Sequence, residues 1–156
     1  MHTNPPPPIN KILLLLSGGK DSAECIYLLK ELGFEVIALC ISGKQQIERI
    51  GAQKAAEKHK IPIEIVSVPV FDELTWNPVK LIFRDLIMGA IAIYYCKKLK
   101  INTIATGVKL SDLENPKLFW LSYFLKFSTY ILKSMNLKIM FPLNMDSILK
   151  VTGSTK

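Results

Sequence analysis

Short apolar runs alternate with longer amphipathic stretches along this chain. Residues 11–16, 35–41, 63–68 and 102–106 are rich in aliphatic side chains, which is typical of strands in a buried parallel sheet. Residues 46–59 and the stretch that ends at Gly33 carry apolar positions at helical spacing, which predicts helices, and residues 79–99 are predicted to form a long, mostly buried helix. This alternation predicts an α/β fold, a doubly wound parallel sheet that binds ligands at the carboxyl ends of its strands.

Turn and cap residues divide these elements. Asp21 or Ser22 is expected to cap the first helix, and Gly33 to end it as a C′ residue. Residues 69–78 are expected to form a loop. Residues 1–10 contain four consecutive prolines and are predicted to form a disordered arm, so residues 11–156 form a single domain.

Composition and charge narrow the class of protein. The chain is 49% hydrophobic, but none of its apolar runs reaches the roughly 18 residues that span a bilayer. Cys25, Cys40 and Cys96 are far apart in apolar stretches, which favours buried thiols and a reducing, cytoplasmic location. The net charge of +7 favours a nucleotide, an acidic metabolite or RNA as partner, or a well-solvated surface, without choosing among them.

The segment from Ser17 to Ser22, Ser-Gly-Gly-Lys-Asp-Ser, carries the candidate chemistry. A glycine pair after a buried strand lets backbone N–H groups approach phosphate oxygens, and the following helix adds its positive end. Ser17, Ser22 and Lys20 can bind the same oxygens. Asp21 either fixes the loop through backbone N–H groups or holds Mg²⁺. The Walker spacing is absent, so ordinary γ-phosphate hydrolysis is not favoured.

This segment resembles the SGGxDS loop of the PP-loop ATP pyrophosphatases, with matches at Ser17, Gly18, Gly19, Asp21 and Ser22. The resemblance implies an adenine nucleotide alpha hydrolase-like, Rossmann-like fold. It also implies an ATP-dependent ligase that uses Mg²⁺ and cleaves ATP to AMP and pyrophosphate through an adenylated substrate. A strand-to-helix turn that happens to contain glycine is the alternative.

Two further segments are similar to the 7-cyano-7-deazaguanine synthase family. Residues 41–46 stand where that family has D-Y-G-Q-x-H and match at Gly43, which implies a substrate contact there. Residues 81–87 are similar to its G-R-N-x-x-F stretch, which implies that Arg84 opens a helix and holds the leaving pyrophosphate. An arginine paired with Asp85 or another carboxylate is the alternative.

The C-terminal half matches the same family in part. Thr106-Gly107-Val108 followed by Asp112 resembles its T-G-V-x-x-x-D segment, which implies a nucleotide contact at Gly107 and a substrate contact at Asp112, although Asp112 could instead cap a helix. Residues 114–120 keep only the proline of the family's base-reading segment, and residues 141–143 are similar to its T-P-L segment. The family's zinc module, which follows, is expected to be missing here.

The resemblance implies that Lys20, Asp21 and Arg84 act in catalysis, and that the reaction converts 7-carboxy-7-deazaguanine, ammonia and ATP into the nitrile. A tRNA-modifying PP-loop enzyme is one alternative. The sequence shows neither a separate RNA-binding module nor a catalytic cysteine pair, which counts against it. A non-catalytic nucleotide-binding protein is another. The aromatic stretch 118–132 is expected to pack on the core or to form a homodimer, with a membrane-surface helix as the alternative.

Overall fold

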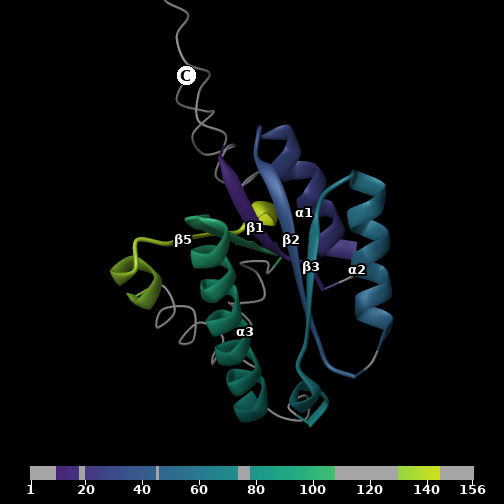
Figure 1. Ribbon diagram of the computed structural model, residues 1–156, viewed down its shortest axis with the longest axis vertical. Coiled ribbons are helices and arrows are strands. Elements are labelled where there is room, and N and C mark those ends of the chain that lie inside the picture. The colour runs from purple at the N-terminus through teal and green to yellow at the C-terminus, as the bar shows by residue number, and fades with distance from the viewer. Residues whose placement is uncertain (1–9, 18–19, 45, 74–77, 108–129, 145–156) are drawn as a thin grey trace, which may run out of the picture.

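The computed structural model describes residues 10–17, 20–44, 46–73, 78–107 and 130–144. Five parallel strands form one sheet in the order β3-β2-β1-β4-β5 (Figure 1). Their bounds are Lys11–Leu15 for β1, Glu35–Ser42 for β2, Ile63–Ser67 for β3, Thr103–Thr106 for β4 and Lys138–Met140 for β5. The four strands predicted from the sequence are confirmed. The prediction lacks β5, because three residues are too few to show a pattern.

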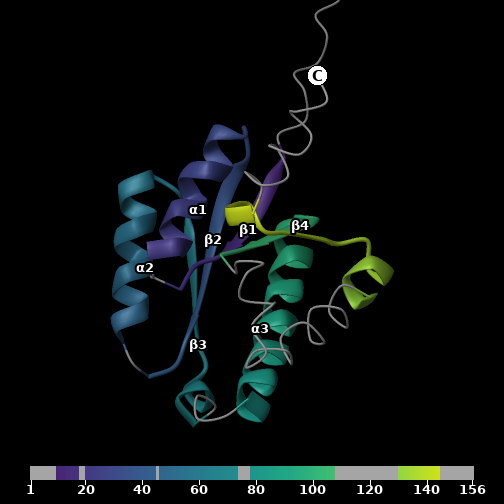
Figure 2. The ribbon, with the colours of Figure 1, turned by 180° about the vertical axis from the view of Figure 1, so that it is seen from behind.

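Helices cover both faces of this sheet. The helices α1 (Lys20–Glu31) and α2 (Gln46–His59) lie on one face, and α3 (Pro78–Leu99) lies on the other (Figures 1 and 2). Strand β1 serves both cores: Ile12 and Leu14 pack in the cluster that includes α1, whereas Leu13 packs in the cluster that includes α3. The doubly wound α/β fold is therefore confirmed, and burial on both faces explains the unbroken apolar run of β1.

The three cysteines are buried thiols outside any disulfide, as the sequence predicts. Burial raises the pKa of the Cys96 thiol to about 11. Burial, assisted by the charge of Glu48, also raises the pKa of Cys40. Both thiols are therefore held in their neutral, unreactive form at physiological pH.

The helices end in one common backbone motif. At the end of α1, the N–H of Phe34 donates to the Leu29 carbonyl and the N–H of Gly33 to the Lys30 carbonyl, both at 3.0 Å. This pair of bonds is a Schellman motif with Gly33 at C′, where its φ is +86°, so the predicted cap is confirmed. The same backbone pattern recurs with a residue of positive φ at Lys60, Lys100 and Asn136.

Two sequence-based boundaries are wrong. Because α1 already begins at Lys20, Asp21 and Ser22 lie in its first turn and do not occupy the capping position before it. Within the expected loop 69–78, Pro69–Glu73 forms a short 3₁₀ helix, η1, whose Phe71 is buried. The burial of Phe71 anchors η1 to the core, which a count of turn-forming residues does not reveal.

Residues 1–9 of the expected arm lie outside the described residues. In the part of the chain that the structure describes, no helix combines the length and the apolar character needed to cross a membrane.

Replacing Gly33 with alanine should destabilise the fold. A Cβ at this position would meet no atom within 4 Å, so the loss would come from left-handed backbone strain alone. We expect a loss of roughly 1–2 kcal/mol and a fall of several degrees in Tm. Thermal unfolding of Gly33→Ala checks this, and an unchanged Tm would show that the α1 terminus is not held in the left-handed conformation.

Candidate nucleotide-binding site

Parallel pairing brings the loops that follow the strands to one edge of the sheet. Leu15 of β1 pairs with Thr106 of β4, so Ser17 and Gly107 leave the sheet beside each other. On the other side of β1, Ser42 ends β2 and leads into Gly43. The carboxyl edge of such a sheet is where open α/β folds bind ligands.

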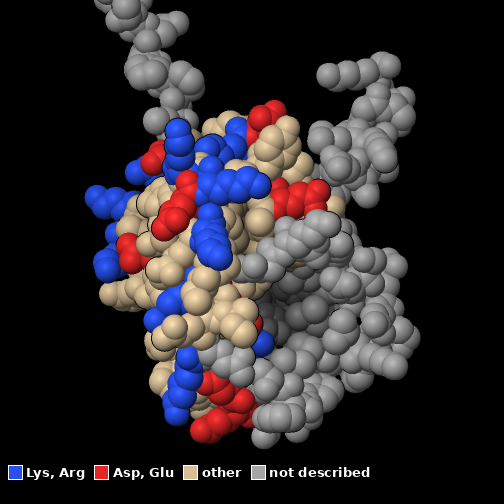
Figure 3. All heavy atoms as spheres, turned by 90° about the vertical axis from the view of Figure 1, so that its right-hand side faces the viewer, with Lys and Arg blue, Asp and Glu red and all other residues tan. Residues whose placement is uncertain are grey.

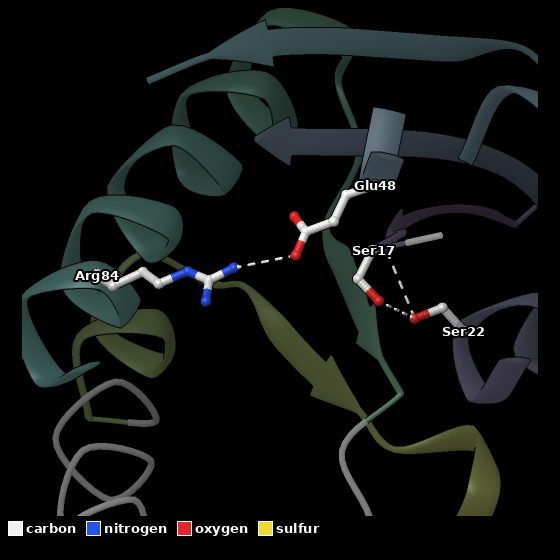
Figure 4. A network of polar contacts seen from close by, with 4 residues as sticks. All are labelled: Ser17, Ser22, Glu48 and Arg84. Carbon is white, nitrogen blue, oxygen red and sulfur yellow. Dashed lines mark hydrogen bonds and ion pairs between the residues drawn. The ribbon is translucent and has the colours of Figure 1, made fainter. Parts of the chain in front are cut away.

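The two serines of the candidate loop contact each other across the start of α1. Ser17 Oγ lies 2.9 Å from Ser22 Oγ, and the Ser17 N–H donates to Ser22 Oγ at 3.5 Å (Figure 4). Ser22 is buried, although its residue type is usually exposed. The Ser22 hydroxyl is thus turned back toward the end of β1, and the positive end of α1 faces the same edge.

Gly107 completes this part of the edge. A Cβ built on Gly107 would lie 3.5 Å from the N, Cα and Oγ atoms of Ser22. Three of the residues predicted to bind the nucleotide, Ser17, Ser22 and Gly107, are therefore brought together by the fold. Lys20 and Asp21 lie in the first turn of α1, directly before Ser22.

The remaining loop and substrate positions are only partly described. Gly18, Gly19 and Asp112 lie outside the described residues. So do residues 118–129 of the aromatic stretch. Within its described end, Tyr130 is exposed and Leu132 is buried in the cluster on the α3 side of the sheet. The roles predicted for these residues stay predictions.

Arg84 reaches this edge from the other face of the sheet. It lies inside α3, not at the helix start that the family resemblance implies, because α3 begins earlier, at Pro78. Its Nη2 atom is 3.9 Å from Oε1 of Glu48, and Figure 4 shows the guanidinium directed from α3 toward that carboxylate. The expected pairing with a carboxylate is thus present, with Glu48 as the partner.

The guanidinium of Arg84 also lies over an aromatic ring. The guanidinium carbon of Arg84 lies 5.5 Å from the ring centroid of Phe71, which belongs to η1. At 3.9 Å and with its Glu48 partner 45% exposed, the ion pair is loose and screened by solvent. The pyrophosphate role of Arg84 stays a prediction.

Asp72, also in η1, fixes the turn that carries Gly43. The Lys44 N–H donates to Asp72 Oδ2 at 2.7 Å. A Cβ added to Gly43 would overlap the Asp72 carboxylate, 2.7 Å from its Cγ atom. Gly43 therefore has a structural reason to be glycine, and its substrate contact stays a prediction. Sequence reasoning misses Asp72 and Phe71, because no local pattern links η1 to a turn about 28 residues earlier.

Buried polar atoms without a partner are concentrated near this edge. Within the described residues they are the Ser42 hydroxyl, at the end of β2, and the Nε atoms of Arg49 and Arg84. Such atoms are rare in folded proteins and often mark functional sites. The same part of the chain holds no group of three or more His, Cys, Asp or Glu that could bind a metal ion.

The part of the chain that contains Ser17 and Ser22 is similar to known proteins. Residues 11–81, from β1 through the start of α3, match the family model described as "Queuosine biosynthesis protein QueC". A 7-cyano-7-deazaguanine synthase from Methanoregula boonei is 36% identical over 84 residues, which cover 53% of this chain and 39% of that protein. A tRNA-specific 2-thiouridylase MnmA from Helicobacter pylori is 34% identical over 116 residues, which cover 62% of this chain and 34% of that protein.

Solved structures show the same fold. A predicted subunit of tRNA methyltransferase from Methanocaldococcus jannaschii aligns with a TM-score of 0.54 at 18% identity, over 86% of this chain and 68% of that one. The NMN synthetase from Francisella tularensis aligns with a TM-score of 0.53 at 18% identity, over 80% and 65%. At these identities the likeness concerns the fold alone.

The parallel sheet, with its serine- and glycine-lined carboxyl edge, defines an α/β fold that resembles that of the PP-loop ATP pyrophosphatase superfamily. Residues 11–81 are similar to the QueC family model, at low identity to the 7-cyano-7-deazaguanine synthase described above. The matched part spans well under half the length of the two curated relatives described above.

The contact between Gly43 and Asp72 predicts a coupled pair of substitutions. Gly43→Ala should lower stability by about 1–3 kcal/mol, because its methyl group overlaps the Asp72 carboxylate. In an Asp72→Gly background, the same change should have little further effect. Chemical denaturation of the two single variants and the double variant measures the coupling. Simple additivity of the two losses would show that the contact does not exist in solution.

Proposed function

We propose that this chain binds ATP at the carboxyl edge of its sheet and cleaves it to AMP and pyrophosphate while activating a carboxylate substrate. The observation that carries the proposal is the contact between Ser17 and Ser22 at the start of α1, with Gly107 packed against Ser22. Small residues at this point leave room for the phosphates, and the helix N-terminus favours their negative charge.

The loop residues have distinct tasks in this proposal. The hydroxyls of Ser17 and Ser22 and the backbone amides of the loop bind phosphate oxygens, and Lys20 contributes positive charge. Asp21 would hold a Mg²⁺ ion together with the phosphates, since such an ion needs only one or two protein carboxylates. When bound, the ion would neutralise part of the phosphate charge.

In the proposed reaction, the substrate carboxylate breaks the bond between the α- and β-phosphates of ATP. One of its oxygens attacks the α-phosphorus, the bond to the bridging oxygen breaks, and pyrophosphate leaves with both electrons of that bond. Arg84 exchanges Glu48 for the leaving pyrophosphate and stabilises its charge. Because Glu48 is on α2 and Arg84 on α3, this exchange would take place between the two layers of helices.

The acceptor we propose is 7-carboxy-7-deazaguanine, with the turn at Gly43 and with Asp112 as substrate contacts. Ammonia displaces AMP from the acyl adenylate to give the amide. A second activation, at the amide oxygen, and loss of AMP give the nitrile. The family-model match and the 7-cyano-7-deazaguanine synthase relative support this choice. Buried thiols outside any disulfide support a reducing, cytoplasmic location.

Product analysis tests the proposal. We expect pyrophosphate release that requires both ATP and 7-carboxy-7-deazaguanine. Asp21→Asn should abolish it, and Ser22→Ala should reduce it on the order of 10²-fold, the usual effect of removing one charge-stabilising donor. Ser134→Ala is the matched control, because this exposed hydroxyl donates to the nearby Ile131 carbonyl, away from the loop. Inorganic phosphate as the sole product would rule out the proposed bond cleavage.

A second candidate keeps the loop but takes tRNA as the acceptor. It is supported by the 2-thiouridylase from Helicobacter pylori and by a tRNA-5-methyluridine(54) 2-sulfurtransferase from Thermotoga maritima, which is 32% identical over 115 residues. Pyrophosphate release that depends on tRNA, and not on the deazaguanine, would favour this candidate. Binding of tRNA alone would not, because a basic surface binds nucleic acid without chemistry.

A further inference from the structure

Positive charge gathers at the amino edge of the sheet, opposite the nucleotide site. Helices α1, α2 and α3 end there, because each leads into the start of the next strand. Among the described residues, nine exposed lysines lie at these helix ends and strand starts: Lys11, Lys30, Lys58, Lys60, Lys97, Lys98, Lys100, Lys133 and Lys138. We call this set the lysine edge. The carboxylates near it are fewer, namely Glu31, Glu35, Glu57 and Glu64.

The nucleotide side of the sheet does not share this excess. The charged side chains described there are Lys44, Arg49 and Arg84 against Glu48, Asp72 and Glu73, so the two signs balance. Among the described side chains, the excess of positive charge therefore lies away from the ATP loop. Figure 3, which shows the side of the molecule with α2 and β3, has most of its Lys and Arg side chains in the upper half, toward the end of α2, with a smaller number of Asp and Glu side chains among them.

Local contacts hold two of the helix ends of this edge together. Lys30 Nζ donates to the His59 carbonyl at 2.7 Å, which joins the ends of α1 and α2. Burial lowers the pKa of His59, and the charges of Lys58 and Lys30 lower it further. A surface of positive potential disfavours the charged form of a histidine, so the lowered pKa of His59 is consistent with such a surface.

Two of these lysines occupy strained backbone positions. Lys60 and Lys100 have φ values of 55° and 57°, in the left-handed region where a side chain costs roughly 1–2 kcal/mol relative to glycine. Glycine occupies the corresponding position of α1, at Gly33. The motif thus accepts glycine, yet the chain carries lysine at the ends of α2 and α3. Strained residues of this kind cluster at functional sites.

We propose that the lysine edge is a docking surface for the phosphate backbone of a nucleic acid. Ammonium groups bind phosphates as point charges, without reading sequence. An acidic protein is the less suitable partner, because protein interfaces are depleted in lysine and enriched in arginine, and both arginines of this chain lie outside the edge. The docking surface is separate from the ATP loop and goes beyond the proposed function.

The strained lysines allow an unusually specific test. Lys60→Gly and Lys100→Gly should each raise Tm, because backbone strain is relieved, and should each weaken binding of a fluorescent RNA hairpin roughly three- to tenfold at low salt. The slope of log K against log salt should fall by about 0.7–0.9 per lost phosphate contact. Lys54→Gln is the matched control, since Lys54 is exposed within α2, away from its end. It should change neither property appreciably.

Additional variants distinguish the lysine edge from the ATP loop and from a general effect of positive charge. Ser22→Ala should leave RNA binding unchanged even where it reduces pyrophosphate release, so a failure of the proposed function would not affect the result. Lys60→Asn and Lys100→Asn, which tolerate the left-handed conformation, serve if a glycine variant fails to fold. Equal losses in Lys54→Gln, or tighter binding of a poly-aspartate peptide than of RNA at the same salt, would overturn the proposal.

Discussion

The parallel pairing of β1 with β2 on one side and β4 on the other is the constraint on which the rest of the structure depends. Because β1 is buried on both faces, its register is fixed by two cores at once. The carboxyl ends of three strands then meet at one edge. A shift of one residue in the pairing of β4 with β1 would exchange the side chains of β4 that face the two helix layers, and would separate Gly107 from Ser22.

The candidate site is built in two parts on this edge. One part is local: β1, the loop and α1 are consecutive, and Ser17 contacts Ser22 within a single turn of chain. The other part is assembled from distant segments through η1, where Asp72 fixes the turn at Gly43 and Phe71 supports Arg84. The local part holds the residues proposed to bind the nucleotide, and the assembled part holds Gly43 and Arg84, the proposed substrate and pyrophosphate contacts.

The local features of the fold could be predicted from the sequence, and the features assembled from distant segments could not. Strands, helices, the Gly33 cap and the nucleotide loop are encoded by short-range patterns, so they can be recognised from the sequence alone. Two contacts could not be predicted in this way: the pairing of Arg84 with Glu48, and the contact of Asp72 with Gly43. Both depend on which helices and loops become neighbours in the fold, and local sequence patterns do not contain that information. Strand β5 is not predicted, because it is too short to show a pattern. The predicted cap at Asp21 or Ser22 is wrong, because α1 already begins at Lys20. The lysine edge is also a product of topology, since its residues are scattered along the sequence.

The central claim is that ATP occupies the carboxyl edge, between Ser17, Ser22 and Gly107. Titration of the isotope-labelled protein with α,β-methylene-ATP, in which the bond to be cleaved is replaced, tests it most directly through backbone amide chemical shifts. We expect the largest changes at Ser17, Ser22, Lys44 and Gly107, and small ones at Lys60 and Lys100. Changes confined to the lysine edge, or none at the start of α1, would contradict it.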